Sequence, residues 1–191
     1  MRVVTVDGNK FAEMCRTLKE DVISSGYSPD TVVAVARGGV YLAQEMFGEN
    51  FFTVSCAREG TGHKQRWVGA IVRLLPDSVN IALRKLEHRI LGWIDKSGGH
   101  KPRKVTMTPD LEARLKSGGC NVLVVDDAVD SGRSLRSVLE AIRAVNPANE
   151  IRTAVITVTR DNPVTNPDYA LYRNRTLVRF PWAEDVKQLN N

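Results

Sequence analysis

The stretch Val122-Leu-Val-Val-Asp-Asp-Ala-Val-Asp-Ser-Gly-Arg-Ser134 decides the fold of this chain. Its four apolar residues predict a buried strand, and two adjacent carboxylates, Asp126 and Asp127, follow where that strand ends. A third acid, Asp130, precedes a small-residue turn over 131–134 that opens a helix. Such a turn presents unpaired N–H groups and a positive dipole end, which together bind phosphate. Because paired carboxylates suit hydroxyls or a metal-bound sugar, the stretch predicts a ribose phosphate site.

Short apolar runs and helical patterns alternate on both sides of this stretch. β-branched runs bounded by Gly and Pro predict buried strands, and apolar residues at a spacing of three and four predict amphipathic helices. The alternation predicts an α/β fold with a doubly wound, mainly parallel sheet, in which ligands bind beyond the carboxyl ends of the strands. The expected strands are 31–36, 51–55, 122–125 and 151–159, and the expected helices are 7–24, 40–47, 108–117 and 133–145.

A second glycine-containing loop, Arg37-Gly38-Gly39, follows the first expected strand. Glycine is needed where the backbone approaches a ligand closely or adopts a positive φ, and Arg37 adds a cation at the same sheet edge. Taken alone, the loop is equally a tight turn with a surface arginine. Beside the acidic stretch, it predicts a second anion-binding element.

Composition indicates one ordinary globular domain. The chain has 191 residues, of which 42% are hydrophobic and 26% charged. No apolar run approaches the roughly 18 residues that a membrane span needs, and the N-terminus has no signal-peptide pattern. The three cysteines are widely spaced and follow no metal-ligand pattern, so we expect small hydrophobic side chains in a reducing, cytoplasmic compartment.

The net charge of +5 lies in one central segment. Residues 58–104 hold eleven Lys and Arg against four Asp and Glu, a surplus of seven. We interpret residues 58–107 as a basic insertion that contains a mobile loop, one amphipathic helix beginning near Ser78, and a basic linker. Such a charge run is most often a solvated face, but it also fits binding to nucleic acid phosphates.

The two loops together resemble the PRPP-binding elements of the type I phosphoribosyltransferases, where PRPP is 5-phosphoribosyl-1-diphosphate. The resemblance implies that family's fold with a small hood lobe, Mg²⁺ as cofactor, and transfer of ribose 5-phosphate from PRPP to a nitrogenous base with release of diphosphate. Asp126 and Asp127 are then expected at the ribose hydroxyls and, through water, at Mg²⁺. The 5-phosphate is expected on Asp130, Ser131, Gly132, Arg133 and Ser134, and the diphosphate on Arg37, Gly38 and Gly39.

The C-terminal run 160–191, the expected base-binding hood segment, is similar to the end of the 6-oxopurine enzymes, above all the bacterial xanthine–guanine phosphoribosyltransferases. The chain has Arg160 at the strand end where that group has Lys, and Leu177 where it has a stacking aromatic. Arginine suits a carboxylate or a dioxo base as readily as a single carbonyl. The base-binding candidates are Arg160, Leu177, Phe180 and Trp182, with core packing as the alternative for the last two.

The same resemblance gives Asp130 the position of the general acid/base residue facing the purine. It also places a mobile loop inside the insertion, with Lys64, Arg66 and Arg73 as candidates to cover the diphosphate, and implies a homodimer or higher homo-oligomer. The acceptor is then a 6-oxopurine in nucleotide salvage. Two alternatives stay open: a non-purine acceptor, and a nucleic-acid-binding regulator on the same fold that responds to PRPP or nucleotides.

Overall fold

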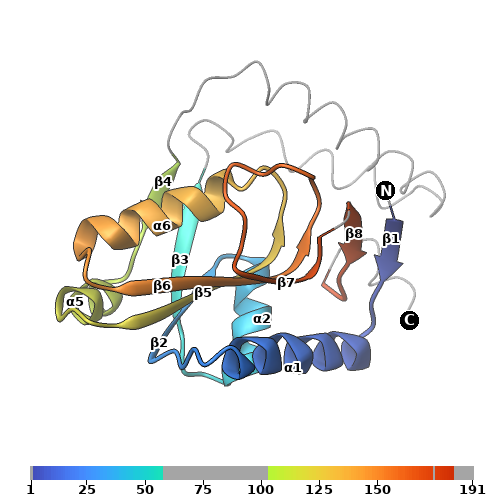
Figure 1. The fold of residues 1–191 in the computed structure, drawn as a ribbon, viewed down its shortest axis with the longest axis horizontal. Coiled ribbons are helices and arrows are strands. Elements are labelled where there is room, and N and C mark those ends of the chain that lie inside the picture. Colours follow the sequence, from blue (N-terminus) through green and yellow to red (C-terminus); the bar gives the residue numbers. More distant parts are fainter. Residues whose placement is uncertain (1, 58–102, 174, 183–191) are drawn as a thin grey trace, which may run out of the picture.

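The computed structural model describes residues 2–57, 103–173 and 175–182, and these form a central sheet with helices on both faces (Figure 1). The strands of this sheet are β2 (Thr31–Val35), β3 (Phe52–Ala57), β4 (Lys104–Thr106), β5 (Asn121–Val129), β6 (Glu150–Val158) and β7 (Tyr169–Tyr172). From edge to edge their order is β4-β3-β2-β5-β6-β7, and the pairs are parallel except for β3 with β4. The predicted α/β fold with a mainly parallel sheet is confirmed.

Two hydrophobic cores lie on opposite faces of this sheet. Helices α1 (Gly8–Ser24) and α2 (Gly38–Phe47) cover one face, and α5 (Pro109–Lys116) and α6 (Arg133–Val145) cover the other (Figure 1). All five residues of β2 are buried. Because alternate residues of a strand point to opposite faces, β2 is covered on both sides of the sheet. No helix within the described ranges is long and apolar enough to cross a membrane.

The helix starts follow the capping signals of the sequence. Asp7 accepts a hydrogen bond from the Lys10 N–H at 2.8 Å and begins α1, and Thr108 accepts from Leu111 to begin α5. Helix α2 begins at Gly38, two residues before its expected start, because Arg37 already has a helical backbone conformation (φ −107°, ψ −36°). The first turn of α2 is therefore built from the predicted anion loop itself.

The end of the predicted insertion is a strand and not a linker. Residues 104–106 form β4, which pairs antiparallel with β3 and sets Lys104 opposite Ala57. Val105 packs against the core under α6 while its two polar neighbours are exposed, which is the alternation of a half-buried edge strand. The rest of the insertion, 58–102, lies outside the described residues, and with it Lys64, Arg66, Arg73 and the expected amphipathic helix.

A separate two-stranded sheet lies beside the C-terminal region. It pairs β1 (Arg2–Thr5) with β8 (Thr176–Arg179) in parallel, with Val3 opposite Leu177. The expected hood segment 160–191 did not include this N-terminal strand, and β7, within that segment, joins the main sheet instead. The partner of this C-terminal strand therefore comes from the N-terminus of the chain.

Candidate functional site

The loops that follow β2 and β5 meet at one edge of the main sheet. The two strands are parallel neighbours with Ala34 opposite Val125, so both loops leave from the carboxyl ends of the strands. From β2 the chain goes outward to β3 on one side, and later from β5 outward to β6 on the other. This reversal of strand order is the place where doubly wound sheets form a ligand-binding crevice. The sheet therefore brings the two predicted anion loops together.

Both glycines of the first loop lie against the end of β5. A Cβ on Gly38 would collide with the Asp127 carboxylate, and one on Gly39 would lie 2.5 Å from the carbonyl oxygen of Val125. Neither glycine has a positive φ. The peptide bond between Ala36 and Arg37 is cis. The close approach that the sequence predicted toward a ligand is thus, in this structure, an approach to the acidic pair.

The environment of the acidic pair disfavours the charged form of both carboxyls. Asp126 and Asp127 are half-buried in the C-terminal half of β5, which continues to Val129 beyond the predicted strand end. The Asp127 N–H donates to Asp126 Oδ1 at 3.0 Å. Burial raises the pKa of Asp126 well above its usual range, and the neighbouring charge of Asp127 raises it further. Burial also raises the pKa of Asp127. A cation placed between these carboxylates would relieve both effects.

These residues fit Mg²⁺ held together with a substrate. Hard divalent ions take carboxylate and water oxygens, and Mg²⁺ in particular keeps waters and uses phosphate oxygens of its substrate. Within the described ranges, no group of three or more His, Cys, Asp or Glu side chains is arranged to hold a metal by itself. Two adjacent carboxylates therefore supply part of a coordination shell, and a bound ligand has to supply the rest.

The turn before α6 has the form of an anion site. Gly132 is the N-cap with φ 76°, and a Cβ there would lie 2.8 Å from the backbone of Thr165. The Val164 N–H donates to the Ser131 carbonyl at 2.9 Å, so a second loop holds the turn from outside. The first turn of α6 contains no acidic residue. Its positive dipole end is left for an external anion.

Sequence reasoning missed one residue at this turn. Arg103 Nη1 donates to Ser134 Oγ at 2.7 Å, and the Arg103 N–H donates to Ser137 Oγ at 3.3 Å. The sequence showed Arg103 only as one of eleven basic residues in the central segment. The nearest signal was the alternating polar and apolar pattern of 104–106, which is too short to predict a strand or its pairing with β3.

Asp130 and Arg160, predicted for different tasks, contact each other. Arg160 Nε donates to Asp130 Oδ1 at 2.8 Å and Nη2 donates to Oδ2 at 2.9 Å, a two-pronged ion pair. The Thr159 hydroxyl donates to Oδ1 at 3.0 Å. Strands β5 and β6 are parallel neighbours, so the ends of both strands bring these side chains to the same edge. The carboxylate of Asp130 is therefore held in a fixed orientation.

The C-terminal aromatics pack with other aromatic rings of the chain. Phe180 is 5% exposed, and the Trp182 ring stacks on Phe180 and on Tyr41 with centroids 4.7 and 4.4 Å away. Phe11 meets Trp182 edge-on. Leu177 is half-buried in β8. The core-packing alternative describes Phe180 and Trp182, although a hydrogen bond from Trp182 also lowers the pKa of Asp127 and so ties this cluster to the acidic pair.

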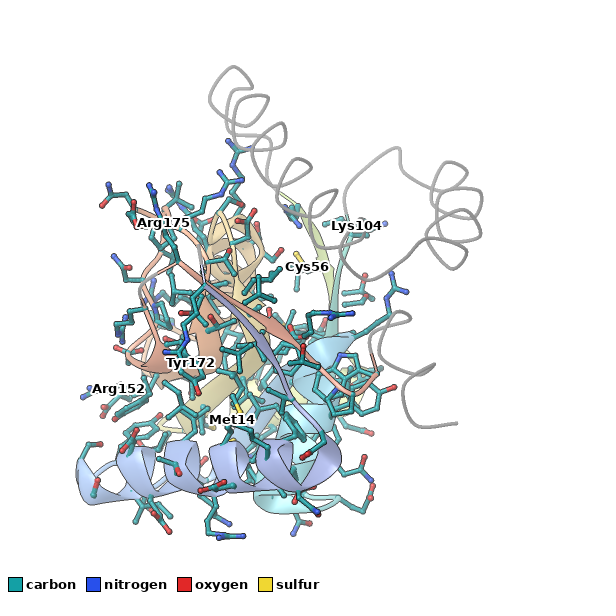
Figure 2. All side chains as sticks on the ribbon, turned by 90° about the vertical axis from the view of Figure 1, so that its right-hand side faces the viewer. Met14, Cys56, Lys104, Arg152, Tyr172 and Arg175 are labelled. Carbon is teal, nitrogen blue, oxygen red and sulfur yellow. The ribbon has the colours of Figure 1, made fainter. Side chains whose placement is uncertain are left out.

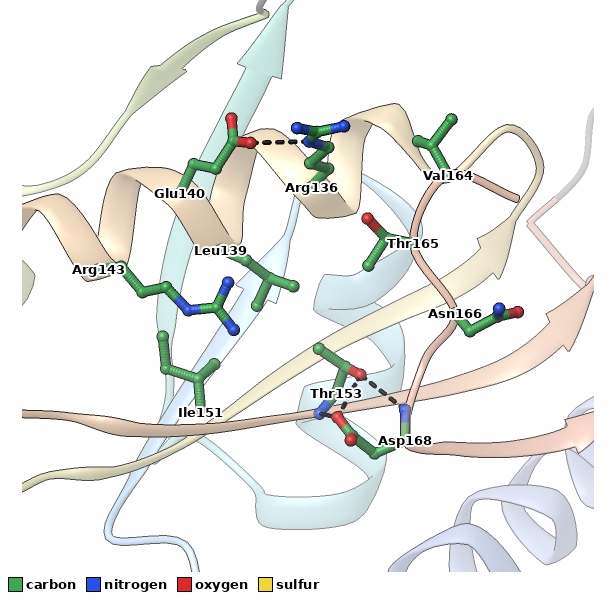
Figure 3. A pocket seen from close by; sticks show the side chains of 10 residues that line it. All are labelled: Arg136, Leu139, Glu140, Arg143, Ile151, Thr153, Val164, Thr165, Asn166 and Asp168. Atoms are coloured by element: carbon green, nitrogen blue, oxygen red, sulfur yellow. Dashed lines mark hydrogen bonds and ion pairs between the residues drawn. The ribbon is translucent and has the colours of Figure 1, made fainter. Parts of the chain in front are cut away.

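A separate pocket of about 360 Å³ lies along α6 on the side of β6 (Figure 3). The side chain of Arg136 pairs with Glu140 on its rim, and Asp168 accepts from Thr153 at 2.7 Å on the opposite wall. None of the predicted site residues lines it. The loops at the carboxyl ends of β2, β5 and β6 therefore remain the candidate site.

Solved structures of other proteins share this fold at low sequence identity. One is a xanthine-guanine-hypoxanthine phosphoribosyltransferase from Helicobacter pylori, with 18% identity, 99% of each chain covered and a TM-score of 0.64. Another is a purine phosphoribosyltransferase from Pyrococcus horikoshii, with 20% identity, 96% of this chain and 95% of that chain covered, and a TM-score of 0.57. A protein from Neisseria gonorrhoeae with bound ppGpp has 16% identity, 99% and 94% coverage, and a TM-score of 0.61.

The sequence itself gives the family. A search of curated proteins finds no match. The profile of the phosphoribosyl transferase domain matches residues 79–189, which is more than half of the chain and includes the acidic stretch, the turn before α6 and the C-terminal strands. Together with the shared fold and the two loops at the switch point, this match shows that the chain belongs to the phosphoribosyl transferase family.

Proposed function

We propose that the protein transfers ribose 5-phosphate from PRPP to a 6-oxopurine base in nucleotide salvage, with Mg²⁺ and with release of diphosphate. The observation that carries this proposal is the contact between the two loops. Gly38 and Gly39 lie directly against the acidic end of β5, where a diphosphate group and the ribose hydroxyls of one substrate would be neighbours. The turn before α6 follows on the same edge and suits the 5-phosphate.

In this proposal each loop binds one part of PRPP. The backbone N–H groups of 131–134 and the hydroxyls of Ser131 and Ser134 bind the 5-phosphate, while Arg37 with the N–H groups of Gly38 and Gly39 binds the diphosphate. Asp126 and Asp127 hold the ribose hydroxyls and water on Mg²⁺. The metal supplies charge neutralisation of the departing diphosphate. The residues themselves position the two reactants and exclude water from the sugar.

Asp130 is proposed as the general base that takes a proton from the acceptor. Its carboxylate lies at the end of β5, between the phosphate turn and the end of β6. Arg160 and Thr159 fix its plane, much as a third group orients the base in other acid–base sites. Arg160 is thus proposed to act on the base both directly and by positioning Asp130.

The same ion pair supports a neutral acceptor over one that carries a carboxylate. The Asp130 carboxylate occupies the Nε–Nη2 edge of the Arg160 guanidinium, and a carboxylate on the acceptor would be repelled by this negative charge. A carbonyl oxygen of a purine needs only one donor. The names of two structural relatives, purine and xanthine-guanine-hypoxanthine phosphoribosyltransferase, agree with such a base, and ppGpp, bound to the third, contains guanine.

The test is diphosphate release from Mg²⁺·PRPP with six acceptors supplied singly: hypoxanthine, guanine, xanthine, adenine, uracil and orotate. We expect turnover with at least one of the three 6-oxopurines and none with orotate. Turnover with orotate or uracil alone would overturn the assignment of the base. If no base gives turnover in a protein that still binds PRPP by calorimetry, the family assignment stands and the proposed activity is wrong.

Alanine at Gly38 is expected to weaken PRPP binding by about tenfold or more, because its Cβ displaces the Asp127 carboxylate from the site. The side chain of Asp127 is able to move, so the variant should still fold. Alanine at Gly39 is expected to lower thermal stability instead, since its Cβ meets the backbone of Val125. Calorimetric titration with Mg²⁺·PRPP and a melting curve separate the two effects.

The matched control for these variants is Gly8→Ala in the first turn of α1. A Cβ at Gly8 meets nothing within 4 Å and the residue lies far along the chain from both loops. We expect unchanged PRPP affinity and a gain of about 0.5–1 kcal/mol in stability. Equal PRPP affinity in Gly38→Ala and Gly8→Ala would show that the Asp127 position does not matter for binding.

The nucleic-acid-binding regulator stays a prediction, because most of the basic surplus falls within 58–102. Its test is an anisotropy titration with RNA and duplex DNA at two salt concentrations, where a phosphate-binding surface gives steeply salt-dependent affinity. The expected homodimer is likewise a prediction, and sedimentation would measure it.

A further inference from the structure

Arg103 is held against the first turn of α6 by two contacts. Its Nη1 donates to Ser134 Oγ at 2.7 Å and its own N–H donates to Ser137 Oγ at 3.3 Å. Residues three apart lie on the same face of a helix, so both serines lie on the face of α6 that contacts Arg103. The arginine is half-buried. These contacts bring a full positive charge to the predicted 5-phosphate turn.

The sheet, and not a surface loop, sets this position. Arg103 directly precedes β4, whose pairing with β3 sets Val105 opposite Cys56. The thiol of Cys56 in turn lies 3.9 Å from the carbonyl oxygen of Ser134. Figure 2 shows Cys56 and Lys104 on the same side of the molecule. Arg103 is thus tied to β3 through the pairing of the adjacent β4 and to α6 through its own contacts, and such ties orient a binding residue.

The contact with Arg103 also decides what the Ser134 hydroxyl does. A serine hydroxyl has one proton to donate and two lone pairs that accept. Since Ser134 Oγ accepts from the guanidinium, its own proton is directed to another acceptor. Ser134 is the second residue of α6, beside the N–H groups that face an anion at this helix end. A phosphate oxygen placed there receives that proton.

We propose that Arg103 is a ligand of the 5-phosphate of PRPP and orients the hydroxyl of Ser134 toward it. The proposal rests on the proposed function, because that function places the 5-phosphate at this turn. It adds a cation from the residue before β4 to a site otherwise built from one turn and one helix end. A guanidinium suits this task because its planar N–H groups bind serine and phosphate oxygens at the same time.

The experiment measures binding of two fragments of PRPP separately. Ribose 5-phosphate reports on the 5-phosphate turn, and Mg²⁺·diphosphate reports on the loop with Gly38 and Gly39. We expect Arg103→Gln to bind ribose 5-phosphate about tenfold more weakly and diphosphate equally well, because the loss is that of a charged hydrogen bond at one end of the substrate. Arg103→Lys keeps the charge and should recover part of the affinity.

Two further variants sharpen the result. Arg152→Gln removes the same charge from an exposed arginine that pairs with Glu150 at the start of β6, three strands along the main sheet from β3. Figure 2 shows Arg152 well apart from Cys56. We expect it to bind both fragments as the unaltered protein does. In a double-mutant cycle, Ser134→Ala and Arg103→Gln should show a loss smaller than the sum of the single losses, because both groups bind the same phosphate.

Three outcomes separate the possible failures. Unaltered affinity of Arg103→Gln for ribose 5-phosphate, in a protein that binds both fragments, overturns the inference alone. The inference is also overturned if Arg103→Gln loses as much affinity for diphosphate as for ribose 5-phosphate, or if Arg152→Gln loses as much affinity as Arg103→Gln. In either case the effect comes from the overall electrostatic field of the protein or from another contact. If the unaltered protein binds neither fragment nor PRPP, the proposed function fails first.

Discussion

Binding of Mg²⁺·PRPP is expected to disappear in the double variant Asp126→Asn, Asp127→Asn. Asparagine keeps the size of each side chain and removes both negative charges, so the variant tests the charge and not the packing. Without a carboxylate the site loses its partners for metal-bound water and its strong acceptors for the ribose hydroxyls. Calorimetric titration of the variant with Mg²⁺·PRPP should give no measurable heat where the unaltered protein gives a saturating curve.

The matched control removes an adjacent acid pair elsewhere. Glu20→Gln with Asp21→Asn changes the net charge equally, and both residues are exposed near the end of α1. We expect this control to bind PRPP with unchanged affinity. If the double variant of the acidic pair binds as tightly as the control does, the proposed PRPP site is wrong.

A melting curve shows whether the double variant folds, and its pH dependence has a defined sign. Burial raises the pKa of both carboxyls in the folded protein, and the neighbouring charge of Asp127 raises that of Asp126 further. A raised carboxyl pKa means that the folded state loses stability as pH rises from the unfolded value of about 4 through the folded value. The asparagine variant lacks this loss. We expect it to melt at a higher temperature than the unaltered protein near pH 7, with a smaller difference near pH 4.

The second large effect is expected at Asp130. Asp130→Asn should lower kcat by about 100-fold or more and leave the KM for PRPP within a small factor, because a general base acts in the transition state and not in substrate binding. Steady-state kinetics with the base that the acceptor assay selects would measure both constants. A change in KM alone would assign Asp130 to substrate binding.

Arg160 provides the companion measurement. Arg160→Gln removes the two-pronged contact that orients Asp130 and should lower kcat, although less than Asp130→Asn does. Arg160→Lys keeps a cation with one point of contact, so its kcat should lie between that of Arg160→Gln and that of the unaltered protein. If Arg160→Gln raises only the KM for the base, Arg160 binds the base without positioning Asp130.

Much of the fold followed from local patterns. The strand before Asp126 and the helix after Gly132 were predictable because a buried apolar run, a tight turn and an amphipathic helix each depend on neighbours within a few residues. The capped starts of α1 and α5 were found for the same reason. The mainly parallel pairing of the main sheet, although not the order of its strands, was predicted from the alternation of these elements.

Edge strands were harder to find. β1, β4 and β8 have three or four residues each, and such short runs carry little periodicity. β4 was interpreted as a linker because its lysine matched the basic run before it. Its strand conformation depends on hydrogen bonds to β3 and on the core under α6, which are interactions with residues distant in the sequence.

The sequence by itself determined the family, the four central strands of the main sheet and most residues of the candidate PRPP site, because contiguous stretches with local physical causes encode them. Tertiary structure alone decided which of these residues meet. It set Gly38 against Asp127, joined Asp130 to Arg160, packed Trp182 among aromatic rings and brought Arg103 to Ser134. Apart from the stacking of Trp182 on Phe180, these contacts join residues at least 30 apart in the sequence. Strand order and strand pairing bring such residues together, and local sequence patterns do not encode them.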